Sequence, residues 1–579
     1  MIRVGDLEFR EATFLDFEFT ARDGEAPVPI CMVAAELGSG KVHRLFEEDL
    51  RRLKALPFPS DTDSLVVAYY SSAEWGCCLS LGLDLPAKAL DLYTEFRCAT
   101  NGKRLAGGSG LVGALHFFGL DAMPIATKEA MRALAMRGGP WTSEERHALL
   151  AYCAADVDAL QRLFTVMAPR LDARRALLRA RYMMAAARIE HAGIPVDQEK
   201  LSDLIAKWDH IKSELIREVD GAYNVYAGNT FKADRWAAWL AGKGIPWPTT
   251  PTGQLALDDD TFREMARVYP EVAPIRELRF SLSQLRLADL AVGRDGRNRV
   301  ILSAFSARTG RNAPSNTRFI FGPAVWTRGL IKPGPRRAIG YCDWSSQEFG
   351  AAAALSGDDA MMATYLSGDP YLTMAKQAGK IPPEGTKKSH KRERDSFKVL
   401  ALATQYGMGI RGFATMAAIS LGHAQELLAW HRSTYPQFWR WSDGAVTHGM
   451  MHGFLYTVFG WYLHVDRDSN VRSLRNFPVQ ANGAEMLRLA CCYATERGIP
   501  VIAPVHDALL VEAAVEDIDE VVRATRTAME DASAAVLGGF RLRSDAKIVR
   551  YPNRYMDASS RASTPAITKA RNAITKIVQ

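Results

Sequence analysis

The sequence predicts an α/β domain followed by a larger α+β region that is rich in helices. Up to about residue 165, apolar runs typical of strands, such as ATFLDFEF (residues 12–19) and SLVVAYY (residues 64–70), alternate with helical patterns. A strongly helical stretch follows from about residue 170 to 205. Residues 336–350 and 498–515 have the pattern of strands with acidic residues at their ends, and long helical patterns lie between them. We therefore expect at least two structural units.

Length and composition are those of an ordinary globular protein. A chain of 579 residues is long enough for two to four domains, and 48% hydrophobic with 24% charged residues excludes a disordered or fibrous protein. No apolar run reaches the ~18 residues that span a bilayer, and the N-terminus lacks the apolar core of a signal peptide. We expect a cytoplasmic protein without membrane contact. The net charge of +7 suits a nucleic-acid partner but does not by itself establish one.

The eight cysteines show no metal-type spacing. Two adjacent pairs, Cys77 with Cys78 and Cys491 with Cys492, are poorly placed for disulfides. We expect free thiols in a reducing compartment.

The first candidate site lies in FLDFEFT (residues 14–20), where Asp16 and Glu18 share one face of a predicted strand. Two neighbouring carboxylates repel each other near a core unless a cation neutralises them, which favours a divalent-metal site. The alternative is an edge strand with a solvated face. Tyr152 and Asp156 lie one turn apart on a predicted helix, where a tyrosine hydroxyl can orient water and an aspartate can supply a further oxygen ligand.

Together these residues resemble the Asp-Glu-Asp-Asp-Tyr class of 3′–5′ exonucleases. That class carries an Asn-x-x-x-Asp element, and the matching stretch here is YSSAE (residues 70–74), with Asp91 further on. The resemblance makes Glu74 a longer substitute for the usual aspartate and puts Tyr70 in place of the asparagine. We expect Glu74 to bind a metal ion and the domain to proofread. The alternative for Glu74 is an exposed surface acid.

The second candidate site combines three segments. AIGYCDWSSQEFG (residues 338–350) is a predicted strand that ends at Asp343, and VIAPVHDALLVE (residues 501–512) has His506 and Asp507 at the bend between two short strands. If these strands pair, Asp343 and Asp507 can bracket two Mg²⁺ ions.

The third segment is RDSFKVLALATQYG (residues 394–407), in which Arg394, Lys398, Leu402 and Tyr406 recur every four positions on a helix. Two cations and an aromatic on one stripe suit a nucleoside triphosphate with its phosphates at the basic end. Alone, this pattern is more typical of a solvated helix face than of a binding site, but the three segments in this order argue for function. The basic run at residues 387–392 is interpreted as a solvated loop.

Over about residues 12 to 556 the chain resembles family A DNA polymerases of the bacterial DNA polymerase I type without their 5′-nuclease domain. The resemblance includes ARIEHAGIPVD (residues 187–197), the Thr-Gly-Arg turn at residues 309–311 and RSLRNFPVQ (residues 472–480). It implies a ribonuclease H-like 3′–5′ exonuclease domain followed by a right-hand polymerase domain. The compact form resembles phage or prophage members of the family.

The resemblance also implies roles for the matching residues. Asp343 and Asp507 would bind the metal ions, and His506 would position the primer end. Arg394 and Lys398 would bind the triphosphate, with Lys398 as general acid for the leaving pyrophosphate. The residues expected to contact the nascent pair, its sugar or the minor groove are Tyr406, Glu348 (the steric gate against ribonucleotides), Arg311, Gln480, Arg472 and Asn476.

Several positions depart from the family pattern. Leu402 replaces an aromatic that packs on the sugar, Tyr371 replaces a histidine that touches phosphates, and Ala508 replaces an acid. Ser346, Gln347 and Gly350 also differ. None removes a metal ligand, so polymerase activity is still expected, with altered kinetics and nucleotide selectivity.

The expected organisation is an exonuclease domain over residues 1–168 and a polymerase domain over residues 169–556. Within the latter we place the thumb at about 203–292, the palm at about 293–356 and 441–556, and the fingers at about 357–440. Residues 557–579 form a basic tail, interpreted as flexible. The expected cofactor is Mg²⁺, two ions per active site, with Mn²⁺ as a substitute. The expected partners of this monomer are primer–template DNA and dNTPs, in a replication role.

Three alternatives remain. A single-subunit RNA polymerase shares the two aspartates and an Arg/Lys/Tyr helix, although Glu348 and the exonuclease-like domain argue against it. A nuclease whose C-terminal half only binds DNA is disfavoured by Asp343, Lys398 and Asp507. A non-enzymatic replication scaffold leaves both acidic sites unexplained.

Overall fold

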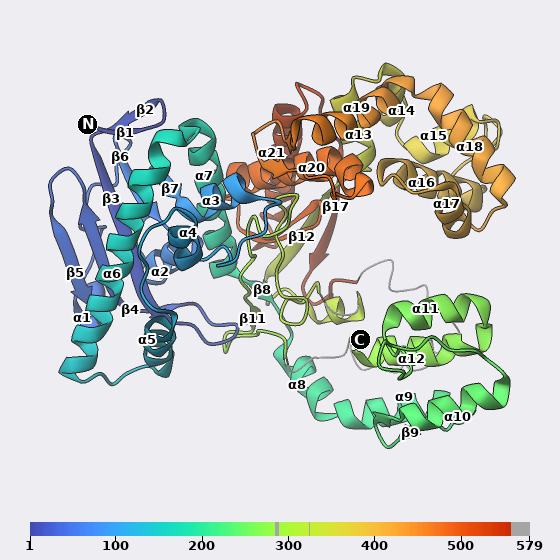
Figure 1. Cartoon of the computed structure of the whole chain (residues 1–579), viewed down its shortest axis with the longest axis horizontal. Coiled ribbons are helices and arrows are strands. Elements are labelled where there is room, and N and C mark those ends of the chain that lie inside the picture. The colour runs from blue at the N-terminus through green and yellow to red at the C-terminus, as the bar shows by residue number, and fades with distance from the viewer. Residues whose placement is uncertain (284–288, 323–324, 557–579) are drawn as a thin grey trace.

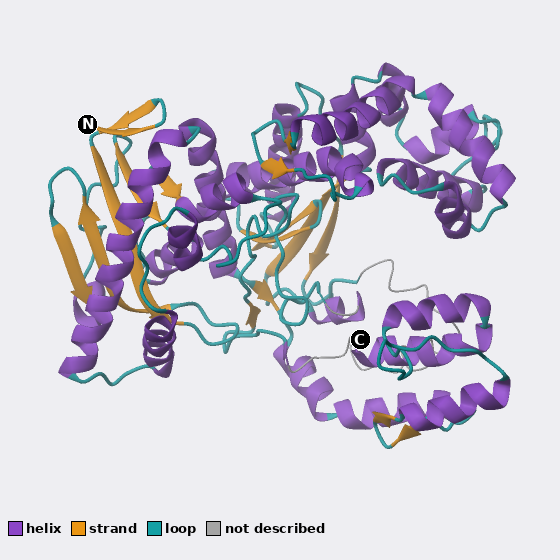
Figure 2. Cartoon of the chain, viewed as in Figure 1, coloured by secondary structure: helices purple, strands orange, loops and turns teal. Residues whose placement is uncertain are grey.

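The computed structural model of the chain describes residues 1–283, 289–322 and 325–556. The expected basic tail lies outside the described residues, as do residues 284–288 of the expected thumb. Strands gather in two places, the N-terminal part and the centre of the molecule, while the remainder is almost entirely helical (Figure 2). The expected mixture of an α/β domain and a helix-rich α+β region is confirmed.

A mixed five-stranded sheet forms the N-terminal domain, in the order β5-β4-β3-β6-β7. The strands are β3 (Glu11–Thr20), β4 (Val28–Glu36), β5 (Val42–Phe46), β6 (Ser64–Ala68) and β7 (Ala89–Asp91). β3 is central, antiparallel to β4 and parallel to β6. Alternation along β3 sends Phe14 into one apolar core and Leu15 with Phe17 into another, so both faces of the sheet are covered. The edge-strand alternative for this segment is therefore wrong.

Helices cover both faces of this sheet, and a small hairpin of β1 (Ile2–Val4) and β2 (Leu7–Phe9) precedes it. α6 (Ser143–Met167) packs against β3 and β4, and its N-terminus carries a capping box in which Thr142 and Glu145 bond each other's backbone amides. The other helices of the domain are α1 (Glu47–Leu50), α2 (Ser72–Ser80), α3 (Leu92–Thr100), α4 (Leu111–Phe117) and α5 (Ile125–Arg137).

Helix α7 (Ala173–Ala192) joins the N-terminal domain to the rest of the molecule (Figure 1). It begins after a short 3₁₀ turn at Ala168–Arg170 and packs against α2 and β7 on one side and α20 and β15 on the other. Gly193 ends it with a φ of 65°, and a Cβ there would lie 2.7 Å from the Arg299 side chain. The short strand β8 (Ile194–Pro195) then pairs with β11 (Arg297–Asn298).

A four-stranded antiparallel sheet occupies the centre, in the order β15-β16-β12-β17. Its strands are β12 (Arg337–Trp344), β15 (Val501–Val505), β16 (Ala508–Ala514) and β17 (Ser544–Arg550). α21 (Ile518–Val536) packs on this sheet and on α20 (Val471–Glu496). Gly340 allows the close approach, since a Cβ there would lie 2.4 Å from the Val522 side chain. The two distant segments predicted to be strands are thus neighbours in one sheet.

Two helical lobes extend from the central sheet on the side away from the N-terminal domain (Figure 1). One contains α8 (Gln198–Ala206), α9 (Trp208–Asp220), α10 (Ala233–Lys243), α11 (Asp259–Val268) and α12 (Ala273–Ser283), with the small strands β9 (Tyr226–Ala227) and β10 (Thr230–Phe231). The other contains α14 (Asp359–Leu366), α15 (Pro370–Gln377), α16 (Lys391–Gln405), α17 (Ile410–Ala417), α18 (Leu421–Thr434) and α19 (Pro436–His452). α13 (Gln347–Ser356) leads into it, and β13 (Phe454–Tyr456) pairs with β14 (Tyr462–His464) after it.

Three expected boundaries fall inside elements of the structure. Residue 203 lies within α8, residue 440 within α19, and residue 168 opens the 3₁₀ turn before α7. Within the described parts of the chain, no helix is both long enough and apolar enough to cross a membrane. All eight cysteines are buried and free.

Candidate active sites

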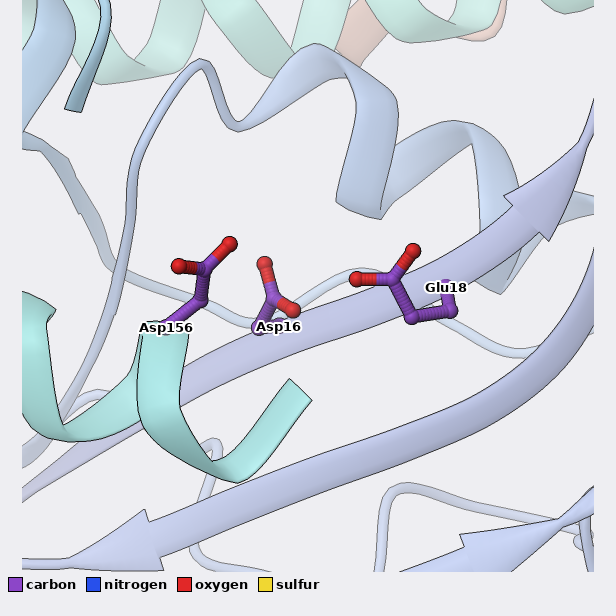
Figure 3. A group of neighbouring side chains, drawn as sticks. All are labelled: Asp16, Glu18 and Asp156. Atoms are coloured by element: carbon purple, nitrogen blue, oxygen red, sulfur yellow. The ribbon is translucent and has the colours of Figure 1, made fainter. Parts of the chain in front are cut away.

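Three carboxylates meet where α6 crosses the central strand of the N-terminal sheet. Asp16 and Glu18 point to the same side of β3, and Asp156 extends from α6 beside Asp16 (Figure 3). One oxygen from each lies within 4.8 Å of the others, close enough to share a metal ion. The strand spacing of two and the helix–strand crossing produce this geometry together.

Burial makes this cluster electrostatically costly. Burial, followed by repulsion from Asp156, raises the pKa of Asp16 to about 7. Burial and repulsion from Asp16 raise the pKa of Glu18 to about 9. One oxygen of Asp16, Oδ2, is buried without a hydrogen-bond partner. A bound divalent cation would remove both the repulsion and the missing contact, so the donor set fits a metal ion.

Glu74 lies on α2, near Asp16 and Glu18, and is only 5% exposed. Its interpretation as an exposed surface acid is therefore wrong. Burial, with repulsion from Asp16 and Glu18, raises its pKa well above the usual range. The backbone amide of Phe17, between the two acids of β3, donates a hydrogen bond to it. Its Oε2 has no hydrogen-bond partner. Glu74 therefore adds a fourth carboxyl to the same small volume.

Tyr152 and Lys128 border the cluster. Tyr152 is buried on α6, and its hydroxyl hydrogen-bonds Asp156 one turn away. Lys128, on α5, forms an ion pair with Asp156 in which Nζ is 3.0 Å from Oδ2. Its ammonium also lies 5.8 Å from the centre of the Tyr152 ring. Sequence reasoning did not select Lys128, because no local pattern distinguishes it from other lysines of a helix.

Asp91 has a structural role. It is completely buried at the N-terminus of α3 and accepts hydrogen bonds from the backbone amides of Ser71 at 2.6 Å and Thr94 at 3.0 Å. The Ser71 hydroxyl donates a third bond at 2.7 Å. Asp91 thus caps α3 and fixes the turn at Tyr70, whose φ of 62° lies in the left-handed region.

The second site lies at one end of the central sheet. Asp343, near the end of β12, is opposite Ala508 on β16 and opposite Asp545 on β17. The backbone amide of Trp344 donates to the carbonyl of Asp507 at 3.3 Å, which ties the two aspartate segments together. His506 forms the bend between β15 and β16 with a φ of 57° and is exposed.

The carboxyl groups of this site also repel one another. Burial, followed by repulsion from Asp507 and Asp545, raises the pKa of Asp343 to about 6. Burial raises the pKa of Asp507, and the neighbouring His506 lowers it again in part. Asp545 was not identified from the sequence. Because directly opposed residues of antiparallel strands point to the same face, only the β12–β17 register places Asp545 beside Asp343.

The predicted triphosphate helix is α16. Arg394 is held by Asp369 at 2.7 Å and by Asp395 at 3.0 Å, while Lys398, one turn further on, is exposed. At the C-terminal end, the Tyr406 hydroxyl donates to the carboxylate of Glu348 on α13, at 2.7 Å from Oε2 and 2.9 Å from Oε1.

Tyr371 lies on α15, buried with only 7% of its surface exposed. The Arg394 guanidinium lies 5.2 Å from its ring centre, and Ser346 hydrogen-bonds its hydroxyl. The Tyr371 ring therefore packs against the Arg394 guanidinium. Leu402 lies on α16, half-buried between Lys398 and Tyr406.

The remaining predicted residues surround the Tyr406–Glu348 pair. Arg311 lies 3.6 Å from Glu348, and Gln480 of α20 hydrogen-bonds the Tyr406 hydroxyl. Asn476 is half-buried on α20 with an Oδ1 that has no partner. Arg472 is exposed at the start of α20, and its Cα would lie 3.7 Å from a Cβ at Gly407. The end of α16 and the start of α20 are therefore in contact.

Residues 317–548 match the family model of DNA polymerase family A. The matched residues include β12, β15, β16 and most of β17 of the central sheet, together with α13 to α21. They also include every predicted residue of the second site except Arg311. Family A polymerases use divalent metals, and the Asp343–Asp507 pair, with its raised carboxyl pKa values, suits a divalent cation.

Curated proteins similar to this chain include DNA polymerase I of Chloroflexus aurantiacus, 24% identical over 419 residues, with 65% of this chain and 44% of that protein covered. The thermostable DNA polymerase I of Thermus aquaticus is 24% identical over 435 residues, covering 68% of this chain and 50% of that protein. The DNA polymerase of Mycobacterium phage D29 is 26% identical over 253 residues, covering 42% and 41% of the two chains. The chain spans about half the length of the bacterial relatives it matches.

Among solved structures, the POL domain of Pol1 from M. smegmatis, in complex with DNA primer-template and dNTP, has a TM-score of 0.71 and 16% identity. The likeness covers 94% of this chain and 96% of that chain. At this identity it shows a shared fold, which extends well beyond the residues that match the family model.

Proposed function

We propose that the protein is a DNA-directed DNA polymerase that extends the 3′ end of a primer with dNTPs in replication. The observation that carries this proposal is that Asp343 and Asp507 are neighbours at one end of the antiparallel sheet, within the residues that match the family model. α16 carries the basic and aromatic stripe, and its end is hydrogen-bonded through Tyr406 to Glu348. These groups are the ones that a nucleotidyl transfer needs at a metal-dependent site.

In the polymerase site the chain's own residues would bind and orient the substrates. Asp343 and Asp507 would hold the divalent ions, which when bound supply Lewis acidity to the 3′-hydroxyl and charge neutralisation to the triphosphate. Arg394 and the exposed Lys398 would contact the phosphates, and Lys398 would donate a proton to the leaving pyrophosphate. His506 would position the primer end.

The nascent base pair would lie near the Tyr406–Glu348 hydrogen bond. The Glu348 carboxylate, held by Tyr406 and Arg311, would occupy the space of a ribose 2′-hydroxyl and favour dNTPs. Arg311 and Gln480 would contact the minor groove, with Arg472 and Asn476 behind them. Tyr371 and Leu402 would shape the nucleotide pocket, Tyr371 by supporting Arg394.

We further propose that the N-terminal domain is a ribonuclease H-like 3′–5′ exonuclease that proofreads. The support is the Asp16, Glu18 and Asp156 cluster on a mixed sheet, with Tyr152 beside it. These carboxylates would hold Mg²⁺, and Glu74 would be a further oxygen donor. Tyr152 would orient the attacking water. The domain bounds of about 1–168 and 169–556 belong to this proposal.

The phage or prophage origin is also a proposal, supported by the likeness to the phage D29 polymerase and by Leu402 and Ala508. We infer a monomer that acts on primer–template DNA in the cytoplasm of a bacterial host.

The first test is primer extension with Mg²⁺ on a labelled primer–template, run with dNTPs, with rNTPs and without nucleotides. Extension with dNTPs only, together with shortening of the primer when nucleotides are absent, supports both active sites. Extension with rNTPs as efficient as with dNTPs would support a single-subunit RNA polymerase instead. Absence of any extension would overturn the polymerase proposal.

Matched variants assign the two activities to their sites. Asp507→Asn should abolish extension and leave shortening intact, while Asp16→Asn should do the reverse. Glu520→Gln, an exposed acid on α21, and Asp84→Asn, an exposed acid of the N-terminal domain, are the controls and should change neither activity. If Asp507→Asn extends primers normally, the C-terminal part only binds DNA.

A further inference from the structure

Lys128 brings a positive charge to the carboxylate cluster of the N-terminal domain. α5 packs against both α6 and β3, the two elements that carry the cluster. This packing places Lys128 Nζ 3.0 Å from Asp156 Oδ2. Among the residues that the structure describes, Lys128 is the one basic side chain in an ion pair with Asp16, Glu18 or Asp156.

One ammonium group does not balance this site. Three carboxylates share the site, and Glu74 lies near enough to be repelled by Asp16 and Glu18. Both Asp16 Oδ2 and Glu74 Oε2 are buried without hydrogen-bond partners. Lys128 contacts Asp156 at the outer side of the cluster and leaves these two oxygens unsatisfied. The inner oxygens therefore remain available for a divalent ion while Lys128 keeps its own position.

Lys128 also has the accessibility that a ligand contact needs. Its side chain is 33% exposed, compared with 14% for its partner Asp156. An ammonium group has three N–H donors, and Asp156 accepts from one of them, which leaves donors for an anion arriving from solvent. The Tyr152 ring, 5.8 Å away, places this ammonium beside the tyrosine proposed to orient water.

We propose that Lys128 binds the phosphate of the 3′-terminal phosphodiester at the exonuclease site. This inference rests on the proposed exonuclease function and adds a substrate-binding residue to it. The ammonium contributes a fixed positive charge on the side of the phosphate that faces solvent, and it forms no covalent bond during the reaction. Charge developing on the phosphate oxygens during attack by water strengthens the contact, so Lys128 lowers the barrier as well as the dissociation constant.

The test compares wild-type protein with Lys128→Gln and Lys128→Arg, all as the full chain. A 5′-labelled single-stranded oligonucleotide is digested with Mg²⁺ and no dNTPs, and kcat and KM are measured separately. We expect Lys128→Gln to lower kcat by about tenfold or more. Lys128→Arg keeps the charge and should recover most of the rate. Lys54→Gln, an exposed lysine of the same domain, is the matched control and should behave as wild type.

A second measurement tests the phosphate contact directly. Binding of the oligonucleotide is measured in Ca²⁺ by fluorescence anisotropy, with either a normal or an uncharged methylphosphonate linkage at the 3′ end. Lys128→Gln should weaken binding of the normal DNA and have no further effect on the methylphosphonate DNA. Primer extension by each variant reports on folding, because the polymerase site does not include Lys128.

Two results would overturn the inference. If Lys128 is only a counter-ion for Asp156, Lys128→Gln will tighten Mn²⁺ binding and leave the rate unchanged or higher. Equal losses of binding with normal and methylphosphonate DNA would exclude contact with this phosphate. If the wild-type protein shortens no DNA, the exonuclease proposal itself fails, which is distinct from normal shortening by both wild type and Lys128→Gln.

Discussion

At the scale of single residues, the metal-binding role proposed for Asp16 opposes the stability of the metal-free protein. Its unfolded pKa of 3.8 rises to about 7 in the folded protein, chiefly because of burial. Without metal, the unfolded chain therefore loses its proton first as the pH rises. The folded state loses stability between about pH 4 and 7, and the full penalty, about a few kcal/mol, applies above pH 7.

Asp16→Asn should therefore stabilise the metal-free protein. We expect the melting temperature of the N-terminal domain in EDTA to rise at pH 8 by about 2–4 °C for each kcal/mol of penalty removed, and by less at pH 5. Differential scanning calorimetry at the two pH values measures this, with Asp84→Asn as the exposed control. If Asp16→Asn melts below the wild-type protein at both pH values, the raised pKa of Asp16 is not what destabilises the folded protein.

Metal binding at the same cluster should depend on pH in a defined direction. Protons compete with a cation for Asp16 and Glu18, whose pKa values are raised to about 7 and about 9. The Mg²⁺ concentration for half-maximal shortening should therefore fall as the pH rises from 6.5 to 8.5. A Mg²⁺ titration at each pH tests this, and an unchanged half-maximal concentration would show that both carboxyl groups are already ionised at pH 6.5.

Selection of deoxynucleotides should depend on the Glu348 carboxylate. Its two hydrogen bonds from Tyr406, at 2.7 and 2.9 Å, hold it in place against the predicted sugar position. Glu348→Ala should raise rNTP incorporation relative to dNTP incorporation by about tenfold or more. Single-nucleotide kcat/KM values for matched dNTP and rNTP measure the ratio. Tyr406→Phe keeps the ring but removes the hydroxyl that holds the carboxylate, so it should give a smaller change. An equal change would show that the position set by the hydroxyl, rather than the presence of the carboxylate, decides the selectivity.

At the scale of elements, the turn between β6 and α2 is held by Asp91, the residue that caps α3. Asp91 receives three hydrogen bonds of 2.6–3.0 Å from Ser71 and Thr94 while completely buried. Asp91→Ala should lower the free energy of unfolding of the N-terminal domain by about 3 kcal/mol, because it leaves buried amide donors unpaired. Denaturant unfolding measures the loss. Ser71→Ala removes only the hydroxyl, so an equally large loss there would exclude the cap as the cause.

At the scale of the whole molecule, buried contacts join the N-terminal domain to the rest of the chain. Arg179 of α7 forms a two-pronged ion pair with Glu95 of α3, at 2.6 and 2.7 Å, with 8% and 3% of the side chains exposed. Asn101 donates to the carbonyls of Arg308 at 2.7 Å and Tyr462 at 2.8 Å. These contacts position the two proposed active sites relative to each other.

Arg179→Met should destabilise this junction by about 3–5 kcal/mol, because it leaves the Glu95 carboxylate buried without its cation. The double variant Arg179→Met with Glu95→Gln should recover part of that loss. Calorimetry should show separate transitions of the N-terminal domain and the remainder in the single variant. The single variant Glu95→Gln completes the comparison. If the double variant loses as much stability as the two single variants added together, the pair contributes no coupling energy.

The sequence alone predicted the parts of both sites that lie within one element. Alternation along residues 14–20 placed Asp16 and Glu18 on one face, and helical spacing did the same for Tyr152 and Asp156 and for Arg394 through Tyr406. These relations follow from the periods of strand and helix, which depend only on neighbours in the chain. The mixed α/β and α+β architecture was predicted for the same reason.

Tertiary structure decided which residues come from other elements to complete each site. The β12–β17 register brings Asp545 to Asp343, and the packing of α5 brings Lys128 to Asp156. The packing of α2 against β3 and α7 buries Glu74. Hydrogen bonds from Ser71 and Thr94 make Asp91 a cap. Local periodicity contains no information about such long-range partners, because register and packing are set by the burial of apolar surface over the whole domain.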